Sequence, residues 1–175
     1  MGNPADWRSL PLGQRTVIFG VVDVSEHRVG QTDLDAVVEQ GRNLIRAGAD
    51  ALDVSLGGFD LGTSPVQRDE CALRVLSAVE ALRATVLVPL AADVIADDHA
   101  RAVLTGGASV VRYRSPPASS RVAEVAATAG AALILGYRTG DEEHASPTED
   151  GRPVTCRCRW KTVWPPCLPV LTTSR

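Results

Sequence analysis

Two aspartates in the first third of the chain stand where acidic side chains could contact a ligand. Asp23 and Asp53 each lie near the end of a short run of mostly apolar residues, at 17–24 and 51–54. Such runs are typical of buried parallel strands, and parallel α/β sheets bind their ligands at the carboxyl ends of the strands. Acids at strand ends also cap helices or remain solvated, and both interpretations stay open here.

Two other patterns have a chemical interpretation beside an ordinary structural one. The glycines of SLGGFDLG, at 55–62, could cradle a phosphate, but their spacing matches neither a P-loop nor a dinucleotide-binding loop, which favours an ordinary loop. Cys156, Cys158 and Cys167 could supply thiolates, yet they lack the paired spacing of structural zinc sites. The three histidines of the chain lie in unrelated segments, and we expect them to be exposed to solvent.

An alternation of strands and helices must position the two acids. The strand at 17–24 is followed by a helix at 33–46, whose apolar residues recur every three or four positions, and by the strand at 51–54. The pattern continues with helices at 67–82, 95–104 and 122–128 and with strands at 86–90, 109–113 and 132–137. This order predicts an α/β fold with a mostly parallel sheet, either a barrel or a doubly wound sheet.

The composition of the chain changes sharply after residue 140. Residues 151–175 have four Arg, one Lys and no acid, a charge of +5, whereas the first 150 residues carry −8 and the whole chain −3. The tail also contains three of the four cysteines, and its prolines prevent a helix. We therefore predict a lead-in at 1–16, an α/β domain at 17–140, and a linker with an irregular basic tail at 141–175. A disordered tail and a tail read in a shifted frame both fit this composition.

The overall composition indicates a soluble globular protein. Hydrophobic residues make up 45% of the chain and the mean hydropathy is near zero. No apolar stretch approaches the ~20 residues of a membrane span, and the N-terminus lacks the pattern of a signal peptide. We therefore expect a cytoplasmic location and no membrane partner. We also expect no nucleic-acid partner, because the two tryptophans of the basic tail have no folded platform.

Residues 17–140 resemble the dihydropteroate synthase family, the pterin-binding barrels of folate biosynthesis. The family's first strand and loop correspond to residues 20–28, and its AGAD segment and second strand to residues 47–62. The helix QRDECALRVLSAVEALR and the spacing from Asp93 to Gly107 also match. The resemblance covers about five of eight barrel strands. It implies a partial TIM-type (β/α) barrel, with about five parallel strands, intervening helices and an irregular C-terminal tail, in a chain truncated at its C-terminus.

Members of this family join a pterin pyrophosphate to p-aminobenzoate and release pyrophosphate. The resemblance implies that Asp93 and Asp53 bind the pterin and that Asp23 holds Mg²⁺ as a cofactor. Some family residues are replaced: Asp60 stands in place of an arginine, and Arg112 in place of a pterin-binding asparagine. Nothing after residue 140 resembles the last three strands, which supply a lysine and an Arg-x-His segment.

The resemblance therefore implies a transferase of the dihydropteroate synthase type whose catalysis is impaired in this chain. A non-catalytic homologue that acts as a partner subunit is one alternative, and a truncated or frameshifted product without activity is another. The implied small-molecule partners are a pterin and p-aminobenzoate. Because the missing strands would leave a sheet edge open, we also expect a homo- or hetero-oligomer.

Overall fold

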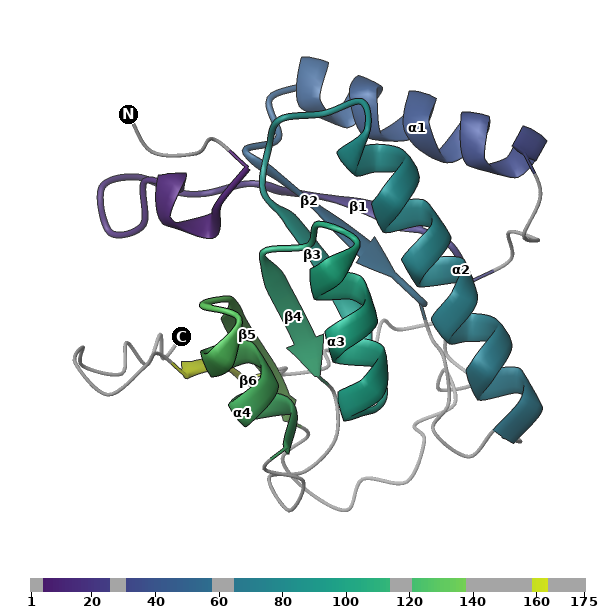
Figure 1. The fold of residues 1–175 in the computed structure, drawn as a ribbon. Coiled ribbons are helices and arrows are strands. Elements are labelled where there is room, and N and C mark those ends of the chain that lie inside the picture. The colour runs from purple at the N-terminus through teal and green to yellow at the C-terminus, as the bar shows by residue number, and fades with distance from the viewer. Residues whose placement is uncertain (1–4, 26–30, 58–64, 114–120, 138–158, 164–175) are drawn as a thin grey trace, which may run out of the picture.

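The computed structural model describes residues 5–25, 31–57, 65–113, 121–137 and 159–163. A short 3₁₀ helix, η1 (Trp7–Ser9), comes first (Figure 1). The helices are α1 (Gln31–Arg46), α2 (Pro65–Arg83), α3 (Asp97–Thr105) and α4 (Arg121–Thr128). The strands are β1 (Phe19–Asp23), β2 (Ala51–Ser55), β3 (Leu90–Val94), β4 (Val110–Tyr113), β5 (Ala132–Tyr137) and β6 (Arg159–Val163). None of the described helices is long and apolar enough to cross a membrane.

The strands form one sheet in the order β1-β2-β3-β4-β5-β6. Strands β1 to β5 are parallel and alternate with helices, which confirms the predicted α/β fold of about five parallel strands. β6 pairs antiparallel with β5 and lies within the tail that the sequence predicted to be irregular. Its residues, RWKTV, include β-branched and aromatic types that favour strands, and the pairing satisfies the outer backbone edge of β5.

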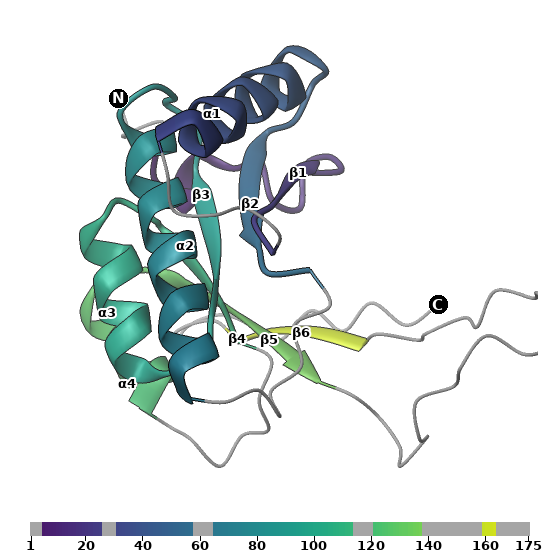
Figure 2. The ribbon, with the colours of Figure 1, turned by 90° about the vertical axis from the view of Figure 1, so that its right-hand side faces the viewer.

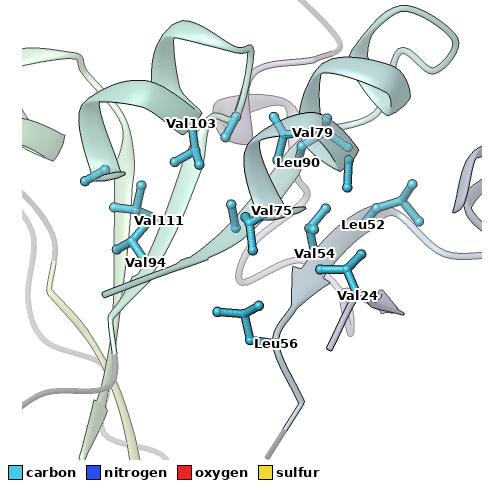
Figure 3. Packing of buried hydrophobic residues seen from close by; sticks show 14 of the residues in the cluster. Val24, Leu52, Val54, Leu56, Val75, Val79, Leu90, Val94, Val103 and Val111 are labelled. Atoms are coloured by element: carbon cyan, nitrogen blue, oxygen red, sulfur yellow. The ribbon is translucent and has the colours of Figure 1, made fainter. Parts of the chain in front are cut away.

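All four helices pack on one face of the sheet (Figure 2). Alternate strand residues point to this face and form one buried apolar cluster with the helices. Figure 3 shows Leu52 and Val54 of β2 beside Val75 and Val79 of α2. A fully buried Val or Leu side chain contributes about 1.5–3 kcal/mol, so this cluster is the main source of the stability of the sheet.

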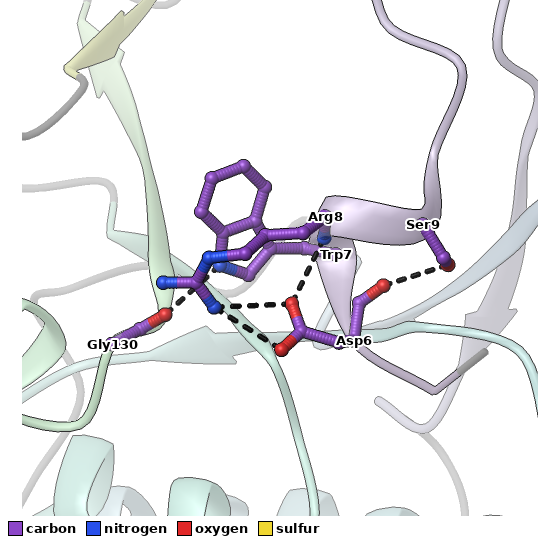
Figure 4. Close-up of polar contacts among 5 residues, drawn as sticks. All are labelled: Asp6, Trp7, Arg8, Ser9 and Gly130. Carbon is purple, nitrogen blue, oxygen red and sulfur yellow. Dashed lines mark hydrogen bonds and ion pairs between the residues drawn. The ribbon is translucent and has the colours of Figure 1, made fainter. Parts of the chain in front are cut away.

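The opposite face of the sheet carries a smaller apolar cluster near the amino ends of the strands. Ala91 of β3, Val110 of β4 and Ala132 of β5 are buried there against Trp7 of η1. The Trp7 indole N–H donates to the Gly130 carbonyl oxygen at 3.0 Å, while Asp6 pairs with Arg8 on η1 (Figure 4). The segment predicted as a lead-in thus closes this end of the open face.

The third strand begins four residues later than the sequence predicted. The Val86 N–H donates to the Leu82 carbonyl oxygen at the end of α2, and Leu87 is 72% exposed, so the apolar run at 86–88 leads out of the helix. β3 begins at Leu90, directly after Pro89. Two alanines and an acid at the centre of this strand give it little β-propensity, which is why the prediction at 86–90 was wrong.

The position of β3 also decides between two interpretations of Asp93. Asp93 lies inside the strand, and the residue that precedes α3 as its N-cap is Ala96. The alternative that Asp93 caps the next helix is therefore wrong. Its side chain instead projects from the sheet on the face away from the helices.

The expected exposure of the histidines is wrong for His99, which is 5% exposed on α3. The other two histidines lie outside the described residues. His99, Ala100 and Val103 form the buried face of this short amphipathic helix, so the side chain is carried into the protein with its apolar neighbours. Burial lowers the pKa of His99 below its ordinary value of 6.5.

We predict that the chain loses stability between about pH 7.5 and 5.5, because of His99. At pH values below the ordinary pKa of histidine, the unfolded chain binds a proton on His99, whereas the buried imidazole of the folded chain resists protonation. The free energy of unfolding therefore falls as the pH falls. Urea unfolding at both pH values measures this change. His99→Leu should flatten the pH dependence; equal slopes in variant and wild type would contradict the prediction. Asp50, with a pKa of about 2 because of its hydrogen bond from Arg15, titrates well below this window.

Candidate functional site

Three charged side chains from three neighbouring strands meet on the open face of the sheet. Because Leu52 and Val54 face the helices, the residue between them, Asp53, faces the other way. The same alternation places Asp93 of β3 and Arg112 of β4 on the open face. They lie on the carboxyl-end side of the small apolar cluster, which is the side where parallel sheets bind ligands.

Arg112 bridges the two acids. Its Nη1 lies 2.6 Å from Asp53 Oδ2, and its Nε lies 2.5 Å from Asp93 Oδ1. Asp53 and Asp93 are 6% and 3% exposed, and the Arg112 side chain is 11% exposed. Burial by itself would lower the pKa of Arg112, but the hydrogen bond to Asp93 and the charges of both acids raise it. The trio is therefore a buried, charge-assisted network with a net charge of −1.

The second oxygen of Asp93 is held by the segment that follows β2. Asp93 Oδ2 accepts hydrogen bonds from the Leu56 N–H at 3.0 Å and from the Ser55 hydroxyl at 3.3 Å. The Ser55 oxygen in turn accepts from the Gly57 N–H at 3.0 Å. Donors from two neighbouring strands thus fix the plane of the Asp93 carboxylate, which makes it a preorganised acceptor.

Asp23 lies at the end of β1 beside the same segment. Its Oδ1 accepts from the Ser25 N–H at 2.9 Å, and it is in register with Ser55. A Cβ atom added to Gly57, which has a φ of +59°, would lie 2.8 Å from Asp23 Oδ2. Glycine at this position therefore gives both the left-handed backbone and the space for the carboxylate. Unlike the other two acids, Asp23 is exposed to solvent.

The structure therefore brings the predicted residues Asp53 and Asp93 together and places Asp23 next to them through residues 55–57. Within the described ranges, no group of three or more His, Cys, Asp or Glu residues could hold a metal ion. A single carboxylate still fits Mg²⁺, which keeps most of its waters and often takes one or two carboxylates beside substrate phosphates. Asp60, most of the glycine loop and the three tail cysteines lie outside the described residues.

The sequence reasoning named Arg112 only as the replacement of a pterin-binding asparagine and missed that it pairs with Asp53 and Asp93. In the parallel register Asp93 is paired with Arg112, so a charged residue within the apolar strand VVRY faces an acid on the next strand. With the third strand placed at 86–90, this pairing was hidden. The sequence feature that could have indicated the pairing is the position of Arg112 inside an apolar strand, because a buried charge requires a partner.

Comparisons with known proteins place the chain in a family. The family model described as "Pterin binding enzyme" matches residues 21–158. No curated protein matches the chain. A dihydropteroate synthase from Stenotrophomonas maltophilia, with imidazole in its active site, is 27% identical with a TM-score of 0.59, over 78% of this chain and 48% of that one.

Two other solved structures show the same likeness. Dihydropteroate synthase from Xanthomonas albilineans, solved with 4-aminobenzoic acid, is 26% identical with a TM-score of 0.60, over 76% of this chain and 50% of that one. The Yersinia pestis enzyme, in complex with a sulfonamide drug, shares the fold at 23% identity and a TM-score of 0.61, over 78% and 51%. The chain spans about half the length of these structures.

Proposed function

The chain belongs to the pterin-binding enzyme family, and from this membership we propose that it binds a pterin as a dihydropteroate synthase-type protein of the folate pathway. One observation carries the proposal. Asp93, 3% exposed, presents a carboxylate on the open face of the sheet, and donors on two neighbouring strands hold that carboxylate in one orientation. Asp53 lies on the other side of Arg112 and adds a second negative charge to the site.

The chemistry of a carboxylate at this place suits a pterin. The amino-pyrimidine edge of a pterin presents two neighbouring N–H groups in one plane, and a carboxylate accepts both of them as a charge-assisted pair. Because Asp93 is buried, such hydrogen bonds form in a low-dielectric environment and are stronger than at an exposed acid. p-Aminobenzoate is the second small molecule that we propose for the site.

We assign Asp23 as the residue that would hold Mg²⁺. Its exposed carboxylate lies against Gly57, at the end of the strand next to β2. Bound Mg²⁺ would offset the negative charge of a pyrophosphate group.

We further propose that this chain by itself does not catalyse the condensation. Asp60 carries a negative charge where the resemblance implies an arginine, and the sequence after residue 140 shows no counterpart of the Arg-x-His segment. Arg112 is engaged by two acids, so its positive charge is already neutralised within the site. Pterin binding and turnover are thus separate properties of this chain, to be measured separately.

Asp93→Asn tests the pterin site. The substitution keeps the size of the side chain and removes its charge, so pterin binding should weaken by about 1.5–3 kcal/mol, the range for a hydrogen bond to a charged group. Calorimetric titration with pterin measures the affinity. Asp98→Asn is the matched control, because Asp98 is an exposed acid on α3, on the helix side of the sheet. Unchanged affinity in a folded Asp93→Asn protein would remove Asp93 from the site.

A role as a partner subunit is the second candidate function, and the edge of the sheet favours it. Among the described residues β1 pairs with β2 on one side, and its other backbone edge has no strand beside it. Val21, on the open face of β1, is 51% exposed, and Ile18 just before the strand is 53% exposed. An unpaired edge next to exposed apolar side chains is a template for pairing with a second chain, of this protein or of another.

We predict that the purified chain self-associates through this edge. Val21→Lys should shift the population toward monomer, because a charge on an edge strand opposes pairing. Light scattering after size exclusion measures the mass. Leu87→Lys is the control, since Leu87 is an equally apolar, exposed residue away from β1. A wild-type chain that is a monodisperse, cooperatively melting monomer would argue against the subunit role.

A further inference from the structure

The carboxylate site is occupied by a group of the chain itself. The Arg112 guanidinium is a planar set of N–H donors, and it donates to Asp93 Oδ1 and to Asp53 Oδ2. A pterin edge is also a planar guanidine-like unit, in which an amino group and a ring N–H are attached to one carbon. Both groups are planar N–H donors to carboxylates: Arg112 donates to one oxygen of each acid, and a pterin edge could donate to both oxygens of one acid.

We propose that Arg112 is an internal occupant of this site, and that a ligand which binds Asp93 must first displace its guanidinium. The inference rests on the proposed pterin site and adds a residue that sets its affinity. It also names the ligand class by chemistry: planar heterocycles with a cyclic guanidine or amidine edge, which can replace the contact that Arg112 makes.

Arg112 competes with a ligand at Oδ1 of Asp93. Oδ2 accepts from the backbone after β2 and from Ser55, and these donors come from the fold itself. Oδ1 accepts from Arg112 Nε at 2.5 Å. A ligand edge that spans both oxygens needs Oδ1, so the Arg112 side chain must release it.

Asp53 provides a place for the displaced side chain. Arg112 Nη1 lies 2.6 Å from Asp53 Oδ2, so the cation can keep one buried partner after it leaves Asp93. Within the described residues, Arg112 Nη2 is buried and has no hydrogen-bond acceptor. The guanidinium thus makes two contacts with acids and leaves one buried N–H donor group unsatisfied, so its present position does not satisfy all of its donors.

Because a ligand must displace the Arg112 guanidinium, the measured affinity for pterin is lower than the affinity of an open site. If the open site is populated in about 10% of molecules or less, the apparent dissociation constant rises about tenfold or more above the intrinsic one. Arg112→Gln puts a neutral amide at this position and removes the charge and the two-acid bridge. The variant should therefore bind pterin at least about tenfold more tightly than the wild type.

The experiment is a calorimetric titration of wild type, Arg112→Gln and Arg83→Gln with pterin, 2-amino-4-oxopteridine. Arg83 is a matched control, because it is a half-buried arginine that donates to backbone carbonyls near the amino ends of the strands. Arg112→Gln could fail to fold because the two acids then repel each other. In that case the single variant Asp53→Asn is compared with the double variant Asp53→Asn, Arg112→Gln. That pair isolates Arg112 in a site with one acid fewer.

Tighter binding on loss of Arg112, with Arg83→Gln equal to wild type, is the expected result. Equal or weaker binding on loss of Arg112 overturns the inference and leaves the proposed pterin site standing. If no protein binds pterin, the proposed function fails, and a second probe decides the inference. Low-millimolar guanidinium chloride should then raise the melting temperature of Arg112→Gln relative to wild type, because the vacated acids accept a free guanidinium. No such difference overturns the inference.

Discussion

Arg112→Ala is expected to lower the free energy of unfolding by about 3–5 kcal/mol, the usual cost of removing one partner from a buried ion pair. A domain of this size is held folded by only ~5–15 kcal/mol. Arg112→Ala is destabilising because the two acids that remain are buried. Asp53 and Asp93 would then face the same space with two negative charges and no cation between them. The loss should exceed that of an exposed ion pair such as Arg8 with Asp6, which contributes about 0–1 kcal/mol.

A double-mutant cycle measures the coupling that causes this loss. Urea unfolding of Arg112→Ala, Asp53→Asn and the double variant at pH 7.5 gives the three free energies. Because Asp53→Asn removes one of the two repelling charges, the double variant should be more stable than Arg112→Ala alone. Additive effects of the two substitutions would show that Arg112 and Asp53 are not coupled.

Much of the fold could be predicted because hydrophobic periodicity reports burial directly. The alternation of strands and helices followed from it, and the fifth strand, 132–137, has the bounds that the sequence predicted. The prediction of the third strand failed because the centre of this strand, Ala-Ala-Asp in LAADV, has low β-propensity, while the more β-like run before it belongs to the exit from α2. Side-chain packing in a fully buried strand replaces the propensity signal that the prediction uses.

The site was predictable only in part, because its residues come from separate strands. Asp23 and Asp53 could be chosen as acids at strand ends, and Asp93 followed from the spacing of a known family. The resemblance put Arg112 in place of a pterin-binding asparagine, but its ion pair with Asp93 could not be predicted without the register between β3 and β4. Register depends on which residues are buried along the whole strand, and one misplaced strand removes that information.

The isolated 175-residue chain should release no detectable pyrophosphate when it is mixed with a pterin pyrophosphate and p-aminobenzoate. Condensation requires cations around the charge that develops on the departing pyrophosphate, and removal of one such electrostatic interaction typically costs ~10²–10³ in rate. Removal of two such interactions together would cost about 10⁴ or more. Asp60 reverses one charge that the resemblance implies, and the Arg-x-His segment has no counterpart.

Arg112 cannot replace these cations from where it lies. Its guanidinium pairs with Asp53 and Asp93, and after the proposed displacement from Asp93 it still pairs with Asp53. Together the three side chains carry −1, which repels an anionic leaving group. A coupled pyrophosphate assay with Mg²⁺ present, and a full-length dihydropteroate synthase as the positive control, measures turnover. Release above background that is abolished by Asp23→Ala would contradict the prediction, because it would show that one carboxylate with Mg²⁺ suffices. Pterin binding without release is the result that the buried trio predicts.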